Sequence, residues 1–415
     1  MNKTFNKNSF LYYILPFIIL LDVFYIFIPS SIGIVKSPLA ILKAFVITVF
    51  FILNLVNNKI DFSNDIKSIF IFSFYLILSN IFLASDHLVS FKGSLSALLP
   101  ILLYTIAKSN VKSNKQLIKI NNSMLFFAII LILNMVLSNI FNIGESDYTY
   151  SDDYEAGSLH DSYNVFTYSL LVLPILGYFS TKKEKKIIFI IGIILFILLI
   201  LTLKRIAILG ALLGFILYFF FLGNFTKNLK RFTFIGIILL IASPFYYDLL
   251  LSRFEVRFEK GTFTNEFYEK EARYLETYFV WNKILSFDDA EFSIFGKDPF
   301  DTVGKYGQNI DFGLREIHVD YNKIVYTLGL LGLFLYLFFH WQIYAEFSKS
   351  KSFANVIPHY KILKATFLVL LIMSLFTSIA GQMQHIAFRS IIFIYLGSIN
   401  GILSFNKKIL LNEKN

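Results

Sequence analysis

Long apolar runs dominate this chain of 415 residues, and they constrain its fold more than any other feature. Most of them contain roughly 17–22 residues, the length that an α-helix needs to cross a hydrocarbon core about 30 Å thick. The sequence therefore predicts an all-α, polytopic transmembrane helix bundle of about twelve spans. We place these spans at residues 11–28, 38–56, 69–85, 94–107, 124–143, 163–180, 187–203, 206–222, 232–250, 320–342, 362–381 and 386–404.

Composition supports a membrane protein and excludes several kinds of chemistry. Hydrophobic residues make up 56% of the chain and charged residues only 16%, too few for the surface of an ordinary soluble domain. The chain contains no cysteine, so disulfides, thiolate nucleophiles and cysteine-based metal sites are excluded. The sequence shows no compact cluster of Asp and His ligands, and we expect neither a metal nor another cofactor.

One long hydrophilic segment interrupts the apolar pattern. Residues 251–317 are charged and punctuated by Gly and Pro. They predict a division into spans one to nine (1–250), a large outer-face insert (251–317), and spans ten to twelve with a tail (318–415). Within the insert we expect short amphipathic helices, one of them over 267–286. Its aromatic stripe would either stack on pyranose rings or pack the helix onto the membrane domain; the stripe is formed by Tyr274, Tyr278 and Trp281.

The distribution of charge orients the spans. Short cytoplasmic loops carry an excess of Lys and Arg, and the lysine-rich loops all fall on one side if both termini are cytoplasmic. The acidic loop 144–162 and the insert then lie outside; that loop would either help to bind an acceptor or simply be solvated. The net charge of +10 is thus mostly an orientation signal for a multi-pass membrane protein, and no nucleic-acid partner is expected. The lysine-rich loops are 108–123, 181–186 and 223–231.

Arginine does not follow this charge rule. Only seven of the 38 basic residues are Arg, and all of them except Arg231 fall on or near the outer side. A guanidinium binds phosphate in a bidentate manner, whereas a lysine ammonium acts as a point charge. Outer-face arginines would therefore suit a lipid pyrophosphate. The alternative is that they pair with acids of the insert or extend from helix ends to the membrane surface. Arg205 is the strongest candidate for a functional role, because it lies between two apolar spans.

Several short motifs resemble one family. The turn LTLKRIAILGALLG around Arg205 resembles the (S/T)-x-R element of the Wzy/WaaL superfamily of O-antigen polymerases and ligases. The insert is similar to that family's long periplasmic loop in position and content. The parts of the insert that resemble this loop are Arg273-Tyr274, Trp281 and the stretch IFGKDPF from Ile294 to Phe300.

The end of the insert carries the rest of the resemblance. His318-Val-Asp-Tyr321 and the following YTLGLLG, from Tyr326 to Gly332, are similar to the family's "HNxyl…GxxG". Two departures stand out. His318 is followed by Val319-Asp320 where the family has Asn, and the "lGvG" stretch keeps one clear glycine, Gly296.

The resemblance implies a metal-independent glycosyltransferase acting at the periplasmic face. Such enzymes transfer a glycan from undecaprenyl pyrophosphate to a sugar hydroxyl, here as an O-antigen polymerase in lipopolysaccharide biosynthesis. By residue matching, Arg205 and Arg273 would bind pyrophosphate, and His318 would act as the base or position the acceptor. The partners would be the lipid-linked oligosaccharide, membrane lipid and a chain-length regulator protein. Further substrate-binding candidates are Lys204, Arg315, Asp320, Tyr321 and Trp281.

Other functions stay open. An O-antigen ligase shares the motifs but delivers the finished glycan to lipid A core; the weak motifs and the Lys/Asn/Ile/Phe-rich composition favour the polymerase. A lipid-linked glycan flippase would show repeat symmetry and mid-span charges, whereas these spans are mostly uncharged apart from Asp22.

Two roles are open for His318, base or helix cap, and Asp320 is an alternative candidate for the base. His318 could cap span ten at the interface, and Asp320 could accept the proton instead. In a helix over 316–320, Glu316 and Asp320 would share a face while His318 points elsewhere. An imidazole has an unperturbed pKa of about 6.5, which suits a base near neutral pH. We therefore expect His318→Ala to abolish polymer and Asp320→Asn to leave much of it.

Overall fold

The protein is a bundle of α-helices. The computed structural model describes residues 10–24, 38–57, 62–141, 163–202, 204–223, 272–305, 316–379, 381 and 383–412, and these residues contain no β-strand. The α-helices are α1 (Ile14–Val23), α2 (Pro38–Asn57), α3 (Asn64–Phe82), α4 (His87–Asn110), α5 (Asn114–Phe141), α6 (Tyr163–Phe179), α7 (Lys182–Leu201), α8 (Arg205–Leu222), α12 (Ala272–Leu285), α13 (Ala290–Phe295), α14 (Asp320–Ser348), α15 (Tyr360–Thr377) and α16 (Ile386–Asn412). Two short 3₁₀ helices, η1 (Phe10–Tyr12) and η4 (Lys351–Phe353), precede α1 and follow α14.

Among the described residues, seven helices are long and apolar enough to cross a membrane: α2, α3, α4, α5, α14, α15 and α16. The prediction of a helical transmembrane bundle is therefore confirmed. A helix also overlaps every other expected span that the structure describes, although α1 and α6 are shorter than the spans expected there. The expected ninth span, 232–250, and the acidic loop 144–162 lie outside the described residues. The total of about twelve spans stays a prediction.

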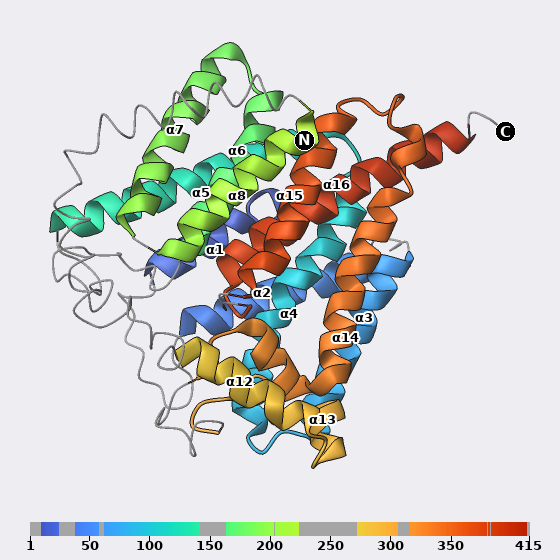
Figure 1. Ribbon diagram of the computed structural model, residues 1–415. Helices are drawn as coiled ribbons and strands as arrows, with labels where there is room; N and C mark the ends of the chain where they lie inside the picture. Colours follow the sequence, from blue (N-terminus) through green and yellow to red (C-terminus); the bar gives the residue numbers. More distant parts are fainter. Residues whose placement is uncertain are drawn as a thin grey trace.

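Helix α16 lies at the centre of the bundle (Figure 1). Its most apolar 18-residue stretch is completely buried, whereas only 22% of the corresponding stretch of α2 is buried. Small residues allow α16 to approach α4 closely, as is common between membrane helices. A Cβ atom added to Gly397 would lie 2.3 Å from the carbonyl oxygen of Tyr104, and one added to Gly401 would lie 2.4 Å from that of Val111.

The prediction of a loop over residues 108–123 is wrong. Helix α4 continues to Asn110 and α5 begins at Asn114, so Lys108 belongs to the last turn of a helix. Its ammonium is buried and lies 2.6 Å from a carboxylate oxygen of Asp65, which also accepts a hydrogen bond from the Tyr104 hydroxyl. The sequence pattern treated Lys108 as a loop charge, but its burial is compensated by an acid on α3.

A second buried ion pair joins the three C-terminal helices. Asp320 begins α14, and its carboxylate lies 3.1 Å from the guanidinium of Arg389 on α16. The same guanidinium donates to the hydroxyl of Ser378, which follows α15, at 2.8 Å. The other carboxylate oxygen accepts the backbone N–H of Met383 at 2.9 Å. Asp320 and Arg389 are 1% and 2% exposed, so this network fixes the first turn of α14 inside the protein.

This pair gives a stability prediction. We expect Arg389→Met to lower the free energy of unfolding by about 3–5 kcal/mol, because Asp320 would then be buried without its cation. Thermal unfolding of the detergent-solubilised protein measures the effect. Lys349→Met is the control, since Lys349 is exposed at the other end of α14 and pairs with Glu346; its effect should stay below about 1 kcal/mol. Equal melting of the two variants would contradict the role of the buried pair.

Candidate active site

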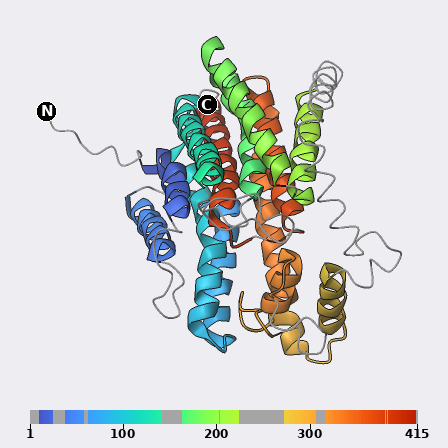
Figure 2. The same ribbon diagram turned by 90° about the vertical axis from the view of Figure 1, so that its left-hand side faces the viewer.

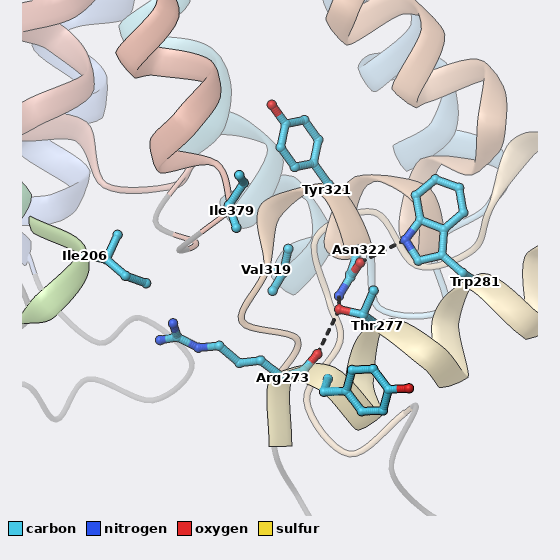
Figure 3. A pocket seen from close by; sticks show the side chains of 9 residues that line it. Ile206, Arg273, Thr277, Trp281, Val319, Tyr321, Asn322 and Ile379 are labelled. Atoms are coloured by element: carbon cyan, nitrogen blue, oxygen red, sulfur yellow. Dashed lines mark hydrogen bonds between the residues drawn. The ribbon is translucent and has the colours of Figure 1, made fainter. Parts of the chain in front are cut away.

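A cleft of about 500 Å³ lies at the end of the bundle that carries α12 and α13. Figures 1 and 2 place these two helices beside the first part of α14. Segments that are far apart in the sequence form its walls, namely α8, α12, the start of α14 and the residues after α15 (Figure 3). The lining residues are Ile206, Arg273, Tyr274, Thr277, Trp281, Val319, Tyr321, Asn322 and Ile379.

The helix expected over 267–286 is present as α12, and its first expected residues lie outside the described part. Its inner face packs on α14 through Val280 and Ile284, which are buried. The members of the expected aromatic stripe differ in exposure. Trp281 turns inward and its indole N–H donates to Asn322 at 3.1 Å, whereas Tyr274 and Tyr278 are 52% and 61% exposed. Trp281 therefore contacts α14 and also lines the cleft, whereas the two tyrosines are more exposed.

Two of the predicted arginines belong to segments that meet at this cleft. The side chain of Arg273 lines the cleft and extends toward Ile206 of α8 (Figure 3). Arg205 is the first residue of α8, directly before Ile206, and Lys204 is the N-cap of that helix. The start of α8, which contains Arg205, and α12, which contains Arg273, therefore meet at this cleft although they are far apart in the sequence. The guanidinium of Arg273, which lines this cleft, is suited to bind a phosphate-bearing ligand.

His318 lies next to the cleft in a segment without helical structure. Helix α14 begins at Asp320, where the tenth span is expected to begin, after the extended N-cap residue Val319, so Glu316 and Asp320 do not share a helix face. The exposed ring of His318 has its Nδ1 atom 2.6 Å from the carbonyl oxygen of Glu316. A carbonyl only accepts, so Nδ1 carries the proton and donates it. In the neutral ring Nε2 is then the acceptor, as a general base requires.

Glu276 of α12 holds this histidine segment in place. Its carboxylate is fully buried and accepts the backbone N–H of His318 at 2.9 Å and that of Val319 at 3.0 Å. It also accepts a hydrogen bond from the side-chain amide of Asn322 at 3.1 Å. Sequence reasoning missed this residue. The available signal was its position four residues before Val280, on the apolar face of an amphipathic helix.

The rival acids have other partners. Both carboxylate oxygens of Asp320 point into the protein, toward Arg389 and the Met383 amide. The carboxylate of Glu316 binds the ammonium of Lys323 at 2.5 Å. Asp320 is thus a structural residue in this arrangement. We now expect Asp320→Asn to destabilise the protein, because it removes the counterion of Arg389.

The remaining predicted substrate residues differ in their placement. Tyr321 lines the cleft, and its hydroxyl donates to the carbonyl oxygen of Leu375 at 2.8 Å. Arg315 lies outside the described residues. No group of three His, Asp or Glu side chains that could hold a metal ion occurs in the described part of the chain.

The glycines of the two motif stretches mark a crossing of helices. Gly329 interrupts α14 with a φ of 66° and a ψ of −174°. A Cβ atom there would lie 2.1 Å from the carbonyl oxygen of Ile294, and one on Gly296 would lie 2.4 Å from the Leu328 amide nitrogen. Tyr75 of α3 donates to the Leu328 carbonyl at 2.7 Å. These close contacts fix α13 against the break in α14.

The turn after α13 is also attached to the turn between α3 and α4. The amide of Ser85 donates to the Asp298 carboxylate at 2.5 Å, and Lys305 lies 3.1 Å from the same carboxylate. Burial by itself raises the pKa of Asp298, but these two donors outweigh it and hold the pKa below its usual value. The contact therefore stabilises the fold at neutral pH and loses its effect as the pH falls through this lowered pKa.

The segment after α15 gives a prediction for the position of His318. Gly381 has a φ of +87°, and a Cβ atom there would lie 1.9 Å from the carbonyl oxygen of His318. We expect Gly381→Ala to cost about 1–3 kcal/mol of stability and to displace the histidine segment. Gly177→Ala in α6 is the control, because no atom lies within 4 Å of its added Cβ. Thermal unfolding should separate the two variants, and equal stability would contradict the close contact.

Comparison with known proteins gives no family for this chain: no protein-family model and no curated protein matches it. The functional conclusion therefore depends on the residues of the cleft and on the motifs noted in the sequence.

Proposed function

We propose that this protein is a glycosyltransferase of the bacterial inner membrane, an O-antigen polymerase that extends a lipid-linked surface polysaccharide. It would transfer the growing glycan from undecaprenyl pyrophosphate to a sugar hydroxyl of the incoming repeat unit. In this proposal the cleft faces the periplasm, both termini are cytoplasmic, and about twelve spans surround it.

One observation carries the proposal. Three segments that resemble the Wzy/WaaL superfamily meet at a single cleft: the start of α8 with Arg205, α12 with Arg273, and the segment from His318 to Tyr321. They are separated in sequence by long stretches, and nothing in local structure requires them to meet. Their convergence is what a shared reaction would require.

The chemistry suits these residues. In the proposed reaction the bond between the anomeric carbon and pyrophosphate breaks as the acceptor oxygen bonds to that carbon. Arg205 and Arg273 would stabilise the negative charge that develops on the leaving pyrophosphate. His318 would take the hydroxyl proton on Nε2, while its Nδ1–H stays bonded to the Glu316 carbonyl. Tyr321 and Trp281 would contribute to the wall against which the substrate binds.

The proposal predicts the phenotype of a deletion strain. Lipopolysaccharide separated on a gel should show a single repeat unit on the core, because repeat units are still made and ligated but not joined. A complete lack of O-chain would instead identify the ligase. An unchanged ladder of long chains would contradict both enzymes.

The arginines give a second prediction. Arg273→Lys and Arg205→Lys keep the charge but lose the planar pair of donors, so we expect each to reduce polymer roughly tenfold or more. Lys297→Ala is the control, since Lys297 is exposed after α13 and does not line the cleft. The amount of each variant in the membrane must equal wild type. Full polymer length in both Lys variants would remove the arginines from the reaction.

A third prediction separates a base from a helix cap at His318. An Asn side chain can still donate to the Glu316 carbonyl in place of Nδ1, but it has no basic nitrogen in place of Nε2 that could take a proton. We therefore expect His318→Asn to keep the fold and to lower the polymerisation rate by about 10²–10⁴-fold. Rates come from conversion of purified lipid-linked repeat units. If His318→Asn is as active as wild type, the histidine is an interfacial cap.

A further inference from the structure

A second cleft, of about 520 Å³, lies between α3 and α4 and has no part in the proposed reaction. It is at the same end of the bundle as α12 and α13, because the α3–α4 turn contacts Asp298. Most of its wall is apolar, and side chains such as Ile77, Ile81 and Phe91 are about half exposed. Such a surface, on helices long and apolar enough to cross a membrane, is suited to contact lipid. Three polar side chains interrupt this wall: Asn80, His87 and Ser94.

Asn80 has an unused hydrogen-bond acceptor. The residue is 7% exposed, and its amide nitrogen donates to the Leu76 carbonyl at 2.7 Å and to the Ser94 hydroxyl at 2.8 Å. Its amide oxygen is buried and has no partner among the described residues. Because this oxygen is buried away from solvent, leaving it without a donor costs free energy. A ligand that brings an N–H or O–H group would remove this cost.

His87 provides a second acceptor at the mouth of the cleft. Its Nδ1 atom lies 2.8 Å from the backbone carbonyl oxygen of Asn80, so Nδ1–H donates and Nε2 of the neutral ring accepts. The preceding residue, Asp86, caps α4 with its carboxylate and adds negative charge beside the histidine. The polar part of the cleft therefore offers acceptors and negative charge to its occupant.

We propose that this cleft binds a diacyl membrane lipid with a primary ammonium headgroup. One acyl chain would lie along the apolar wall, and the ammonium would donate to the Asn80 amide oxygen and to His87 Nε2. Among lipid headgroups, a primary ammonium combines several N–H donors with the positive charge that Asp86 favours. A quaternary ammonium has the same charge but no N–H, and an anionic headgroup would meet the negative charge of Asp86.

Phosphatidylethanolamine and phosphatidylcholine with identical acyl chains provide a matched test. Purified protein is mixed with both lipids in equal amounts, and the lipids that stay bound are counted by native mass spectrometry. We expect wild type to retain phosphatidylethanolamine with about fivefold preference, as one or two net hydrogen bonds would give. Asn80→Leu removes the acceptor while keeping the size of the side chain, so its preference should fall to about one.

Asn139→Leu is the control for this substitution. Like Asn80, Asn139 lies on an apolar helix and donates to the carbonyl four residues earlier, that of Met135, but it lies on α5. Its lipid preference should equal wild type. If Asn80→Leu aggregates, His87→Phe at the exposed mouth gives the same comparison and should also lose the preference.

Three results would overturn the proposal. The first is equal retention of the two lipids by wild type. The second is an unchanged preference in both Asn80→Leu and His87→Phe, which would mean that the lipid binds elsewhere on the surface. The third is stronger retention of phosphatidylglycerol than of phosphatidylethanolamine, since this would identify a hydroxylated anionic headgroup instead.

Discussion

The buried pair of Asp320 and Arg389 fixes the part of the molecule on which the cleft depends. It ties the first turn of α14 to α15 and α16 from the inside. Glu276 holds the preceding residues from the other side, through the backbone of His318 and Val319. The histidine thus lies between two buried carboxylates that bind protein groups and not substrate. Because a buried charge is tolerated only with its partners in place, this position depends on both sets of contacts.

The bundle could be predicted because a membrane leaves few alternatives. Backbone groups cannot remain unpaired in hydrocarbon, so long apolar runs must form helices. The ends of those helices were harder to predict. Lys108 reads as a loop residue beside other lysines, yet it is buried with Asp65, 43 residues away in sequence. A single sequence identifies a charge but not its partner, so it cannot distinguish a solvated lysine from a paired one at a helix end.

A sequence does not show which partner a side chain contacts, and this also explains which site residues were predicted. Arg273, Trp281 and Tyr321 were predicted from residue type and motif, and all of them line the cleft. Glu276 was not recognised, and Arg389 was grouped with the outer-face arginines although it is buried with Asp320, because the roles of these two residues come from partners 42 and 69 residues away in sequence. The aromatic stripe on α12 was only half predictable. Spacing placed its members on one side, but packing against Asn322 decided that Trp281 turns inward.

A substitution near the cleft can act by removing a reacting group or by destabilising the fold, and the burial of the residue distinguishes these two effects. Arg273 and His318 keep contact with solvent, so replacing them changes the chemistry while the packing survives. Glu276, Asp320 and Arg389 are almost completely buried and bind several groups each. Replacing any of these leaves unpaired polar atoms in the interior, which destabilises the fold whatever the reaction. In a test of the proposed reaction, loss of polymer in such a variant would therefore report on the position of the cleft, and a claim about catalysis would require the exposed residues.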